Sequence, residues 1–116
     1  MRRRRRLALA LALGLVAAGA GASAQEVAAS APDVDAGRKL YISSCQRCHG
    51  INLATNGIGF DLRTFPQDDK ERFVRSVTNG LRAMPAWSAT LRAEQIDLIW
   101  AYVGAVNGWK TTPAPH

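Results

Sequence analysis

Apolar residues recur at helical spacing in several parts of this chain, and no stretch alternates between apolar and polar residues as a strand would. The first such part follows Asp33 or Asp35, either of which can cap a helix that continues to Cys45. We therefore expect an all-α domain in which three to four helices are joined by loops.

A middle helix is predicted to start within residues 66–69, where acidic side chains suit the positive end of a helix. It places Phe73 and Val77 on one face, because residues four apart lie on the same side of a helix. Asn79-Gly80 is expected to end it, since glycine favours the backbone conformation that follows a helix.

A last helix is predicted from about Thr90, as its cap, to Val106, with Glu94 in its first turn. Asn107-Gly108 is expected to end it. Its apolar stripe is formed by Ile96, Ile99 and Val103, and is widened by Leu98 and Tyr102.

The start of the chain has the pattern of an export signal. Five arginines at positions 2–6 precede an apolar stretch at 7–18, and Ala22-Ser23-Ala24 forms a cleavage site of the A-x-A type. The apolar stretch is short for a bilayer span, so we expect no stable membrane insertion, with an uncleaved anchor as the alternative. The predicted organisation is a signal peptide (1–24), a flexible linker (25–32), one domain (33–109) and a flexible tail (110–116).

The formal net charge of +6 belongs mainly to this signal. Removal of residues 1–24 takes away five of the 15 Lys and Arg residues and none of the nine Asp and Glu residues, which lowers the charge to +1. No cluster of basic and aromatic residues remains, so we expect no nucleic-acid partner. The chain that remains after this removal is short and can bury only a small core, which favours stabilisation by a disulfide, a metal or a cofactor.

The chemistry-bearing segment is Cys45-Gln46-Arg47-Cys48-His49. Two cysteines three residues apart lie on one face of a helical turn, and His49 projects toward the same side. Two thioether bonds to one planar ring, with the imidazole under its iron, match this arrangement. The spacing C-x-x-C-H is typical of covalent attachment of haem c, and predicts one such haem held through Cys45 and Cys48.

The motif has three other interpretations. A zinc site needs four ligands, and beyond the motif the chain offers only His116 and carboxylates. A thioredoxin-like redox pair requires a strand before the motif and a βαβ context. A structural disulfide leaves His49 without a role.

Met84 is the only methionine after the predicted signal, and it lies in a loop directly before Pro85. Proline favours an extended conformation for the residue before it, which places Met84 poorly for helix packing. We therefore predict Met84 as the second axial iron ligand, because haem held by His and Met is an electron-transfer arrangement. A core-filling methionine and a terminal ligand at His116 are the alternatives.

These residues resemble the class I c-type cytochromes, a family of monohaem proteins with a few helices folded around one haem. The resemblance covers residues 33–109. It includes Gly37 and Tyr41 before the motif and Leu98 and Tyr102 in the last helix. In the family such positions pack the first and last helices across each other, with glycine allowing close approach.

The chain departs from the family at one point. The family often has a proline shortly after the histidine, where a backbone carbonyl accepts the second ring N–H of the histidine. Here no proline occurs between His49 and Pro66, so a carbonyl around residues 57–59 is expected to replace it.

A narrower resemblance is to cytochromes that accept electrons from periplasmic quinoprotein alcohol dehydrogenases. It rests on four short segments: Asp61-Leu62-Arg63, Phe65-Pro66, Asn79-Gly80 and Met84-Pro85-Ala86-Trp87. Arg63 and Trp87 are candidates for hydrogen bonds to a haem propionate. A solvated arginine and a half-buried aromatic residue are the alternatives.

Together these features predict a periplasmic, monomeric electron carrier, not an enzyme, that docks transiently with redox proteins. Its donor would be a dehydrogenase and its acceptor an oxidase or a second carrier. The basic candidates for a docking rim are Arg47, Arg72, Arg75 and Arg82. A haem peroxidase or a gas-sensing module, either with a displaceable sixth ligand, is the rival prediction.

Overall fold

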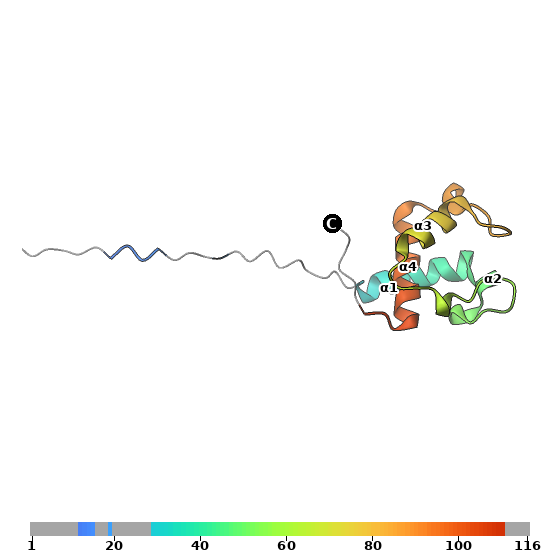
Figure 1. Ribbon diagram of the computed structural model, residues 1–116, viewed down its shortest axis with the longest axis horizontal. Coiled ribbons are helices and arrows are strands. Elements are labelled where there is room, and N and C mark those ends of the chain that lie inside the picture. The colour runs from blue at the N-terminus through green and yellow to red at the C-terminus, as the bar shows by residue number, and fades with distance from the viewer. Residues whose placement is uncertain (1–11, 16–18, 20–28, 111–116) are drawn as a thin grey trace, which may run out of the picture.

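The computed structural model describes residues 12–15, 19 and 29–110. Four α-helices and three short 3-10 turns make up the fold of this part of the chain, which contains no strand (Figure 1). The α-helices are α1 (Ala31–Ser44), α2 (Gln46–His49), α3 (Lys70–Asn79) and α4 (Ala93–Asn107). The 3-10 turns are η1 (Ile51–Leu53), η2 (Leu62–Thr64) and η3 (Trp87–Ala89). The predicted all-α class is confirmed.

Helix α1 begins earlier than expected. Its cap is Ser30, whose hydroxyl accepts a hydrogen bond from the backbone N–H of Asp33 at 3.3 Å. The prediction of Asp33 or Asp35 as the cap is therefore wrong, and Asp33 lies in the first turn. Pro32 is helical because proline is well accommodated in a first turn, so the helix includes the last two residues of the predicted linker.

Helix α3 agrees with the sequence pattern at both ends. The carboxylate of Asp69 caps it by accepting from the N–H of Arg72 at 3.3 Å. Gly80 follows the last turn with a φ of +80°, a conformation that glycine adopts readily. Phe73 and Val77 are both buried, as their spacing predicted.

Helix α4 begins later than expected, and Thr90 is not its cap. The Thr90 hydroxyl instead donates to the carbonyl of Trp87 in η3, and the buried Leu91 separates it from the helix. Arg92 is the cap residue, and its N–H donates to the side chain of Gln95 at 2.9 Å. Glu94 lies in the first turn, as predicted.

Helices α1 and α4 cross in close contact, as the resemblance implied. Gly37 is buried against α4, and a Cβ placed on it would lie 1.9 Å from the carbonyl oxygen of Leu98. One turn further, the rings of Tyr41 and Tyr102 pack with centroids 5.1 Å apart. Both tyrosines belong to a core of buried apolar residues: Tyr41, Leu53, Leu62, Phe73, Val77, Leu91, Ile96, Ile99, Tyr102 and Val103.

The end of α4 is attached to the segment that precedes α3. The indole of Trp100 packs edge-on against the ring of Phe65, with centroids 5.8 Å apart, and lies 4.6 Å from that of Trp109. The side-chain amide of Asn107 donates to the carbonyl of Leu62 at 3.0 Å. These contacts hold the segment around η2 against α4.

No helix in the described residues is long and apolar enough to cross a membrane. The predicted signal peptide, apart from 12–15 and 19, lies outside the described residues. The same holds for linker positions 25–28 and for the tail from 111 onward, which includes His116.

Candidate haem-binding site

The cysteine motif continues the helical path of α1 after a single irregular residue. Cys45 lies between α1 and α2, and its N–H donates to the carbonyl of Tyr41 at 2.8 Å. The N–H of His49 in turn donates to the carbonyl of Cys45 at 3.0 Å. Because the backbone stays helical here, Cys45, Cys48 and His49 remain on one side of the chain, as their spacing predicted.

Both thiols are free for covalent chemistry. Cys45 is half-buried, Cys48 is exposed, and they form no disulfide. Burial, followed by the neighbouring Cys48, raises the pKa of the Cys45 thiol to about 12. The Cys45 thiol is therefore held in its neutral form, which disfavours it as a metal ligand because a metal-binding cysteine must lose its proton. Among the described residues, no group of three or more His, Cys, Asp or Glu side chains is arranged to hold a metal ion.

His49 is oriented by a backbone carbonyl. Its Nδ1 lies 2.8 Å from the carbonyl oxygen of Phe60, which can only accept a hydrogen bond, so Nδ1 carries the proton. The other nitrogen, Nε2, then keeps its lone pair for an iron. The expected acceptor around residues 57–59 is corrected to the carbonyl of Phe60, and the neighbouring Gly59 carbonyl accepts from the hydroxyl of Thr55 at 2.7 Å.

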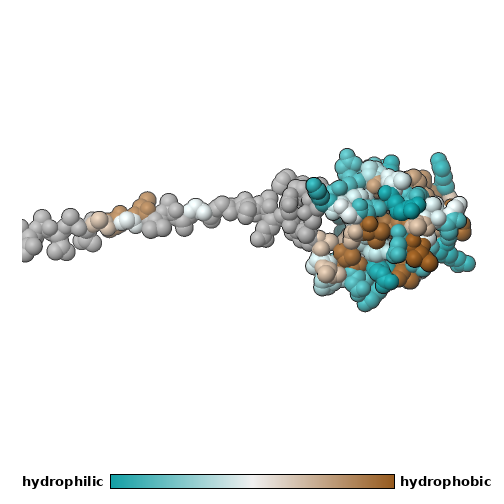
Figure 2. All heavy atoms as spheres, turned by 90° about the horizontal axis from the view of Figure 1, so that it is seen from below, coloured by the Kyte–Doolittle hydropathy of each residue, from teal (hydrophilic) through white to brown (hydrophobic). Residues whose placement is uncertain are grey.

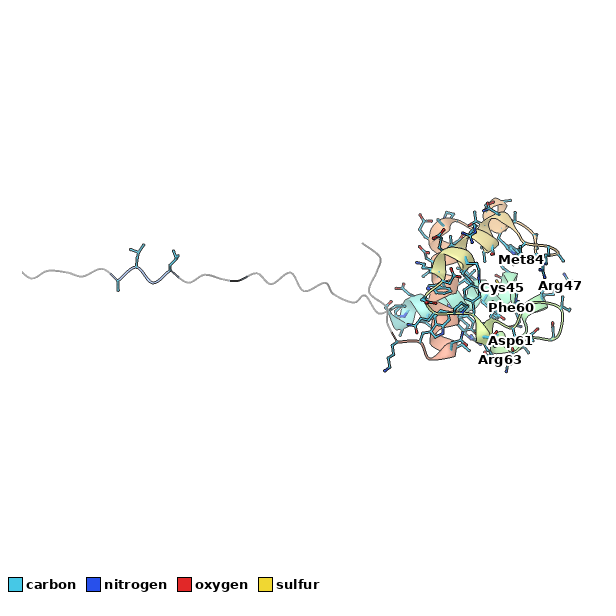
Figure 3. All side chains as sticks on the ribbon, viewed as in Figure 1. Cys45, Arg47, Phe60, Asp61, Arg63 and Met84 are labelled. Atoms are coloured by element: carbon cyan, nitrogen blue, oxygen red, sulfur yellow. The ribbon has the colours of Figure 1, made fainter. Side chains whose placement is uncertain are left out.

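Met84 lies in a tight loop between α3 and η3. Its N–H donates to the Leu81 carbonyl at 3.0 Å, and the N–H of Leu81 donates back to the Met84 carbonyl at 3.1 Å. Gly80 allows this closure, since a Cβ there would lie 2.9 Å from the Met84 oxygen. Figure 3 shows Met84 and Phe60 on opposite sides of Cys45 in this view. The half-buried Met84 is therefore held by its backbone in a loop and not packed in a helix.

The structure places Arg63 and Trp87 in different elements. Arg63 lies in η2, where its Nε and Nη2 donate to the two oxygens of Asp61 at 2.9 and 2.8 Å (Figure 3). This hydrogen-bonded guanidinium lowers the pKa of the Asp61 carboxyl. Trp87 is half-buried at the start of η3. Sequence reasoning missed Asp61 as the partner of Arg63, although an acid two residues before an arginine was a visible signal.

Large apolar side chains close in sequence to the motif and to Met84 are exposed. Their exposed fractions are 68% for Ile51, 71% for Ile58, 55% for Phe60 and 58% for Leu81. Figure 2 shows hydrophobic residues (brown) at the surface between hydrophilic ones (teal). Two free thiols, an oriented imidazole, a thioether and exposed apolar side chains are the groups that a covalently bound haem requires, so the residues present fit it.

Several known proteins are similar in sequence to this chain. Residues 32–103 match the family model described as cytochrome C oxidase, cbb3-type, subunit III. Cytochrome c6 of Aphanizomenon flos-aquae is 34% identical over 90 residues, which cover 67% of this chain and 98% of that protein. Cytochrome c6 of Nostoc sp. is 36% identical over 80 residues, covering 65% of this chain and 72% of that protein.

A third relative is much longer than this chain. The quinohemoprotein alcohol dehydrogenase ADH IIB of Pseudomonas putida is 33% identical over 82 residues, which cover 68% of this chain but only 12% of that protein. No solved structure matches. The family match spans most of the described domain, includes the motif and Met84, and implies covalent haem c as the cofactor. This chain belongs to the cytochrome c family.

Proposed function

We propose that this protein is an exported, monomeric, single-haem electron carrier. Cys45 and Cys48 would attach the haem, and His49 and Met84 would hold its iron. When bound, haem c supplies a one-electron couple between Fe(III) and Fe(II). The observation that carries the proposal is the bond from His49 Nδ1 to the Phe60 carbonyl, which leaves Nε2 free beside two free thiols.

Each ligand has a distinct effect in this proposal. The Phe60 carbonyl fixes the tautomer and ring orientation of His49 and increases the basicity of Nε2. The Met84 thioether favours reduced iron and so raises the reduction potential. With His49 and Met84 both holding the iron, small ligands would find no open coordination site, which favours a carrier over the peroxidase and gas-sensing alternatives.

Arg63 and Trp87 are proposed to donate hydrogen bonds to the haem propionates. Two of the five N–H donors of Arg63 are used by Asp61, and the remaining donors are available. The indole N–H of Trp87 is a single donor on a half-buried side chain.

The proposed location is the periplasm, reached through the predicted signal peptide at 1–24. The proposed electron donor is a dehydrogenase of that compartment, and the acceptor is an oxidase or a second carrier. The similarity to part of a protein named quinohemoprotein alcohol dehydrogenase supports that enzyme class as the donor, because the name joins haem to alcohol dehydrogenation.

Ion pairs reduce the number of arginines that are candidates for the docking rim. Arg72 pairs with Asp69 and Arg75 pairs with Glu71, so their charges are partly balanced. In the described part of the chain, Arg47 and Arg82 form no ion pair. We propose these two exposed arginines as the charges that attract an acidic redox partner.

The test is an optical spectrum of the purified, exported protein, oxidised and reduced, repeated for Met84→Ala and with carbon monoxide. We expect a weak long-wavelength sulfur-to-iron band that is lost in Met84→Ala, and no carbon monoxide binding by the parent. A high-spin parent spectrum, or ready carbon monoxide binding, would instead support the peroxidase or gas-sensing alternative.

A further inference from the structure

The carbonyl that orients His49 is not placed by regular secondary structure. Phe60 lies 11 residues after His49, and residues 54–60 contain neither helix nor strand. A backbone segment without repeating hydrogen bonds needs other contacts to hold one carbonyl within 2.8 Å of an imidazole nitrogen. Two neighbouring polar side chains, Thr55 and Asn56, supply such contacts, and the backbone N–H of Gly59 supplies another.

Thr55 closes the loop on itself. Its hydroxyl accepts from the N–H of Gly57 at 3.1 Å and donates to the carbonyl of Gly59 at 2.7 Å. The second bond gives the Gly59 carbonyl a partner other than His49. The next carbonyl along the chain, that of Phe60, is the one that reaches the imidazole.

Asn56 ties the same loop to the cysteine motif. Its side-chain amide donates to the carbonyl of Arg47 at 2.9 Å, and its side-chain oxygen accepts from the N–H of Ile58 at 3.1 Å. One side chain therefore joins the loop to the segment that carries Cys45, Cys48 and His49.

Gly59 brings the backbone into direct contact with the histidine. Its N–H donates to the Cys48 carbonyl at 2.7 Å. A Cβ at this position would lie 2.9 Å from His49 Nδ1 and 3.0 Å from His49 Cε1, closer than ordinary contact. The loop that Thr55 and Asn56 hold thus lies against the ring itself.

The far side of Phe60 is anchored separately. Leu62 is buried, and its carbonyl accepts from the side chain of Asn107 in α4 at 3.0 Å. Phe60 therefore lies between a point fixed by the Thr55 and Asn56 contacts and a point fixed by α4. A change at Thr55 or Asn56 alters the first point and leaves the second in place.

We infer that Thr55 and Asn56 are positioning residues that direct the Phe60 carbonyl to His49 and thereby lower the reduction potential of the bound haem. The inference rests on the proposed function. A strong bond to Nδ1–H makes Nε2 a better electron donor, which favours oxidised iron. Weakening that bond is expected to raise the potential.

The experiment uses the full chain loaded with haem. Thr55→Val removes the hydroxyl at nearly constant shape, Thr55→Ser retains it, and Asn56→Ala acts through the other set of bonds. The matched control is Thr64→Val. The Thr64 hydroxyl also donates to a backbone carbonyl, that of Asp61, at 2.9 Å, but it takes no part in the hydrogen bonds that Thr55 and Asn56 make. The readouts are the reduction potential and, by NMR of the reduced protein, the exchange rate of the His49 Nδ1 proton.

We expect Thr55→Val and Asn56→Ala to raise the potential and to speed Nδ1 proton exchange by about fivefold, the effect of losing one net hydrogen bond. Thr55→Ser and Thr64→Val should behave like the parent. A normal spectrum with an unchanged potential and exchange rate in both variants would overturn this inference alone. An equal shift in Thr64→Val would also overturn it, and a parent without histidine-ligated haem would overturn the proposed function as well. If Thr55→Val does not fold, Asn56→Ala still tests the inference by the same two measurements.

Discussion

Gly37 of α1 lies directly against the backbone of α4, where a Cβ on it would be 1.9 Å from the carbonyl oxygen of Leu98. That oxygen belongs to a helix backbone that cannot turn aside as a flexible side chain can. The crossing of the two longest helices therefore depends on the absence of a side chain at one position, and Tyr41 and Tyr102 pack together one turn away.

Gly37→Ala is expected to lower the free energy of unfolding by about 3 kcal/mol, because the methyl group forces the helices apart. This outweighs the roughly 1 kcal/mol by which alanine favours a helix over glycine. Denaturant unfolding of the haem-loaded protein measures it. The control is Gly104→Ala, where the new Cβ would lie 3.0 Å from a ring atom of Trp109, a side chain that can shift. Equal losses in the two variants would contradict the argument.

Alkaline stability is expected to depend on Tyr41. Burial, followed by the nearby Cys45, raises the pKa of this phenol well above its ordinary value of 10.0. The folded state thus disfavours the phenolate. The resulting stabilisation is complete below the phenol pKa of the unfolded chain and is lost as the pH rises toward the phenol pKa of the folded protein. Unfolding measured between about pH 7 and pH 11 should show this decline.

Tyr41→Phe separates the two contributions of this residue. At neutral pH the substitution should lower the free energy of unfolding by about 1 kcal/mol. The Tyr41 hydroxyl donates to the Gly50 carbonyl at 2.6 Å, and that acceptor would lose its donor. Above the ordinary phenol pKa the variant should decline less steeply than the parent. An identical alkaline decline in both proteins would show that Tyr41 is not responsible.

The double variant Cys45→Ala/Cys48→Ala is expected to lack covalent haem and to be largely unfolded. Between positions 50 and 61 only Gly50 and Leu53 are buried, so this part of the chain has little apolar core of its own. A covalently held apolar ring supplies the missing contacts. Circular dichroism and haem absorbance after denaturing electrophoresis measure both effects. Ser43→Ala/Ser44→Ala is the control, and native-like helicity in the cysteine variant would refute the expectation.

Reversal of charge at Arg47 and Arg82 is expected to slow electron transfer to an anionic probe. With hexacyanoferrate(III) as the oxidant of the reduced protein, Arg47→Glu/Arg82→Glu should lower the rate about tenfold at low ionic strength and weaken its salt dependence. Arg75→Glu is the control, because Glu71 already balances Arg75 at 3.2 Å. Equal rates in all three proteins would remove the two arginines from the docking surface.

Local signals predicted some helix ends and missed others. Asp69 and Gly80 flank α3 with unambiguous capping chemistry, and both ends were confirmed. At α1, Ser30, Asp33 and Asp35 are all competent caps by residue type, and only the backbone conformation selects Ser30. At α4, Thr90 is a better cap by type than Arg92. The buried Leu91 nevertheless lies between Thr90 and the helix, which begins only after Arg92.

The sequence by itself determined the features that depend on spacing along a continuous helix. Cys45, Cys48 and His49 share one side because a helical turn places residues three and four apart together. The apolar faces of α3 and α4 follow from the same periodicity, as the burial of Phe73, Val77, Ile96, Ile99 and Val103 shows.

Only the tertiary structure decided which carbonyl meets His49. The loop from residue 54 to 60 has no repeating hydrogen bonds, so the choice of Phe60 over its neighbours depends on the bonds made by Thr55 and Asn56 and on the contact of Gly59 with the ring. A local sequence pattern does not distinguish these carbonyls, because every residue of the loop carries the same backbone acceptor and only its position in the fold differs.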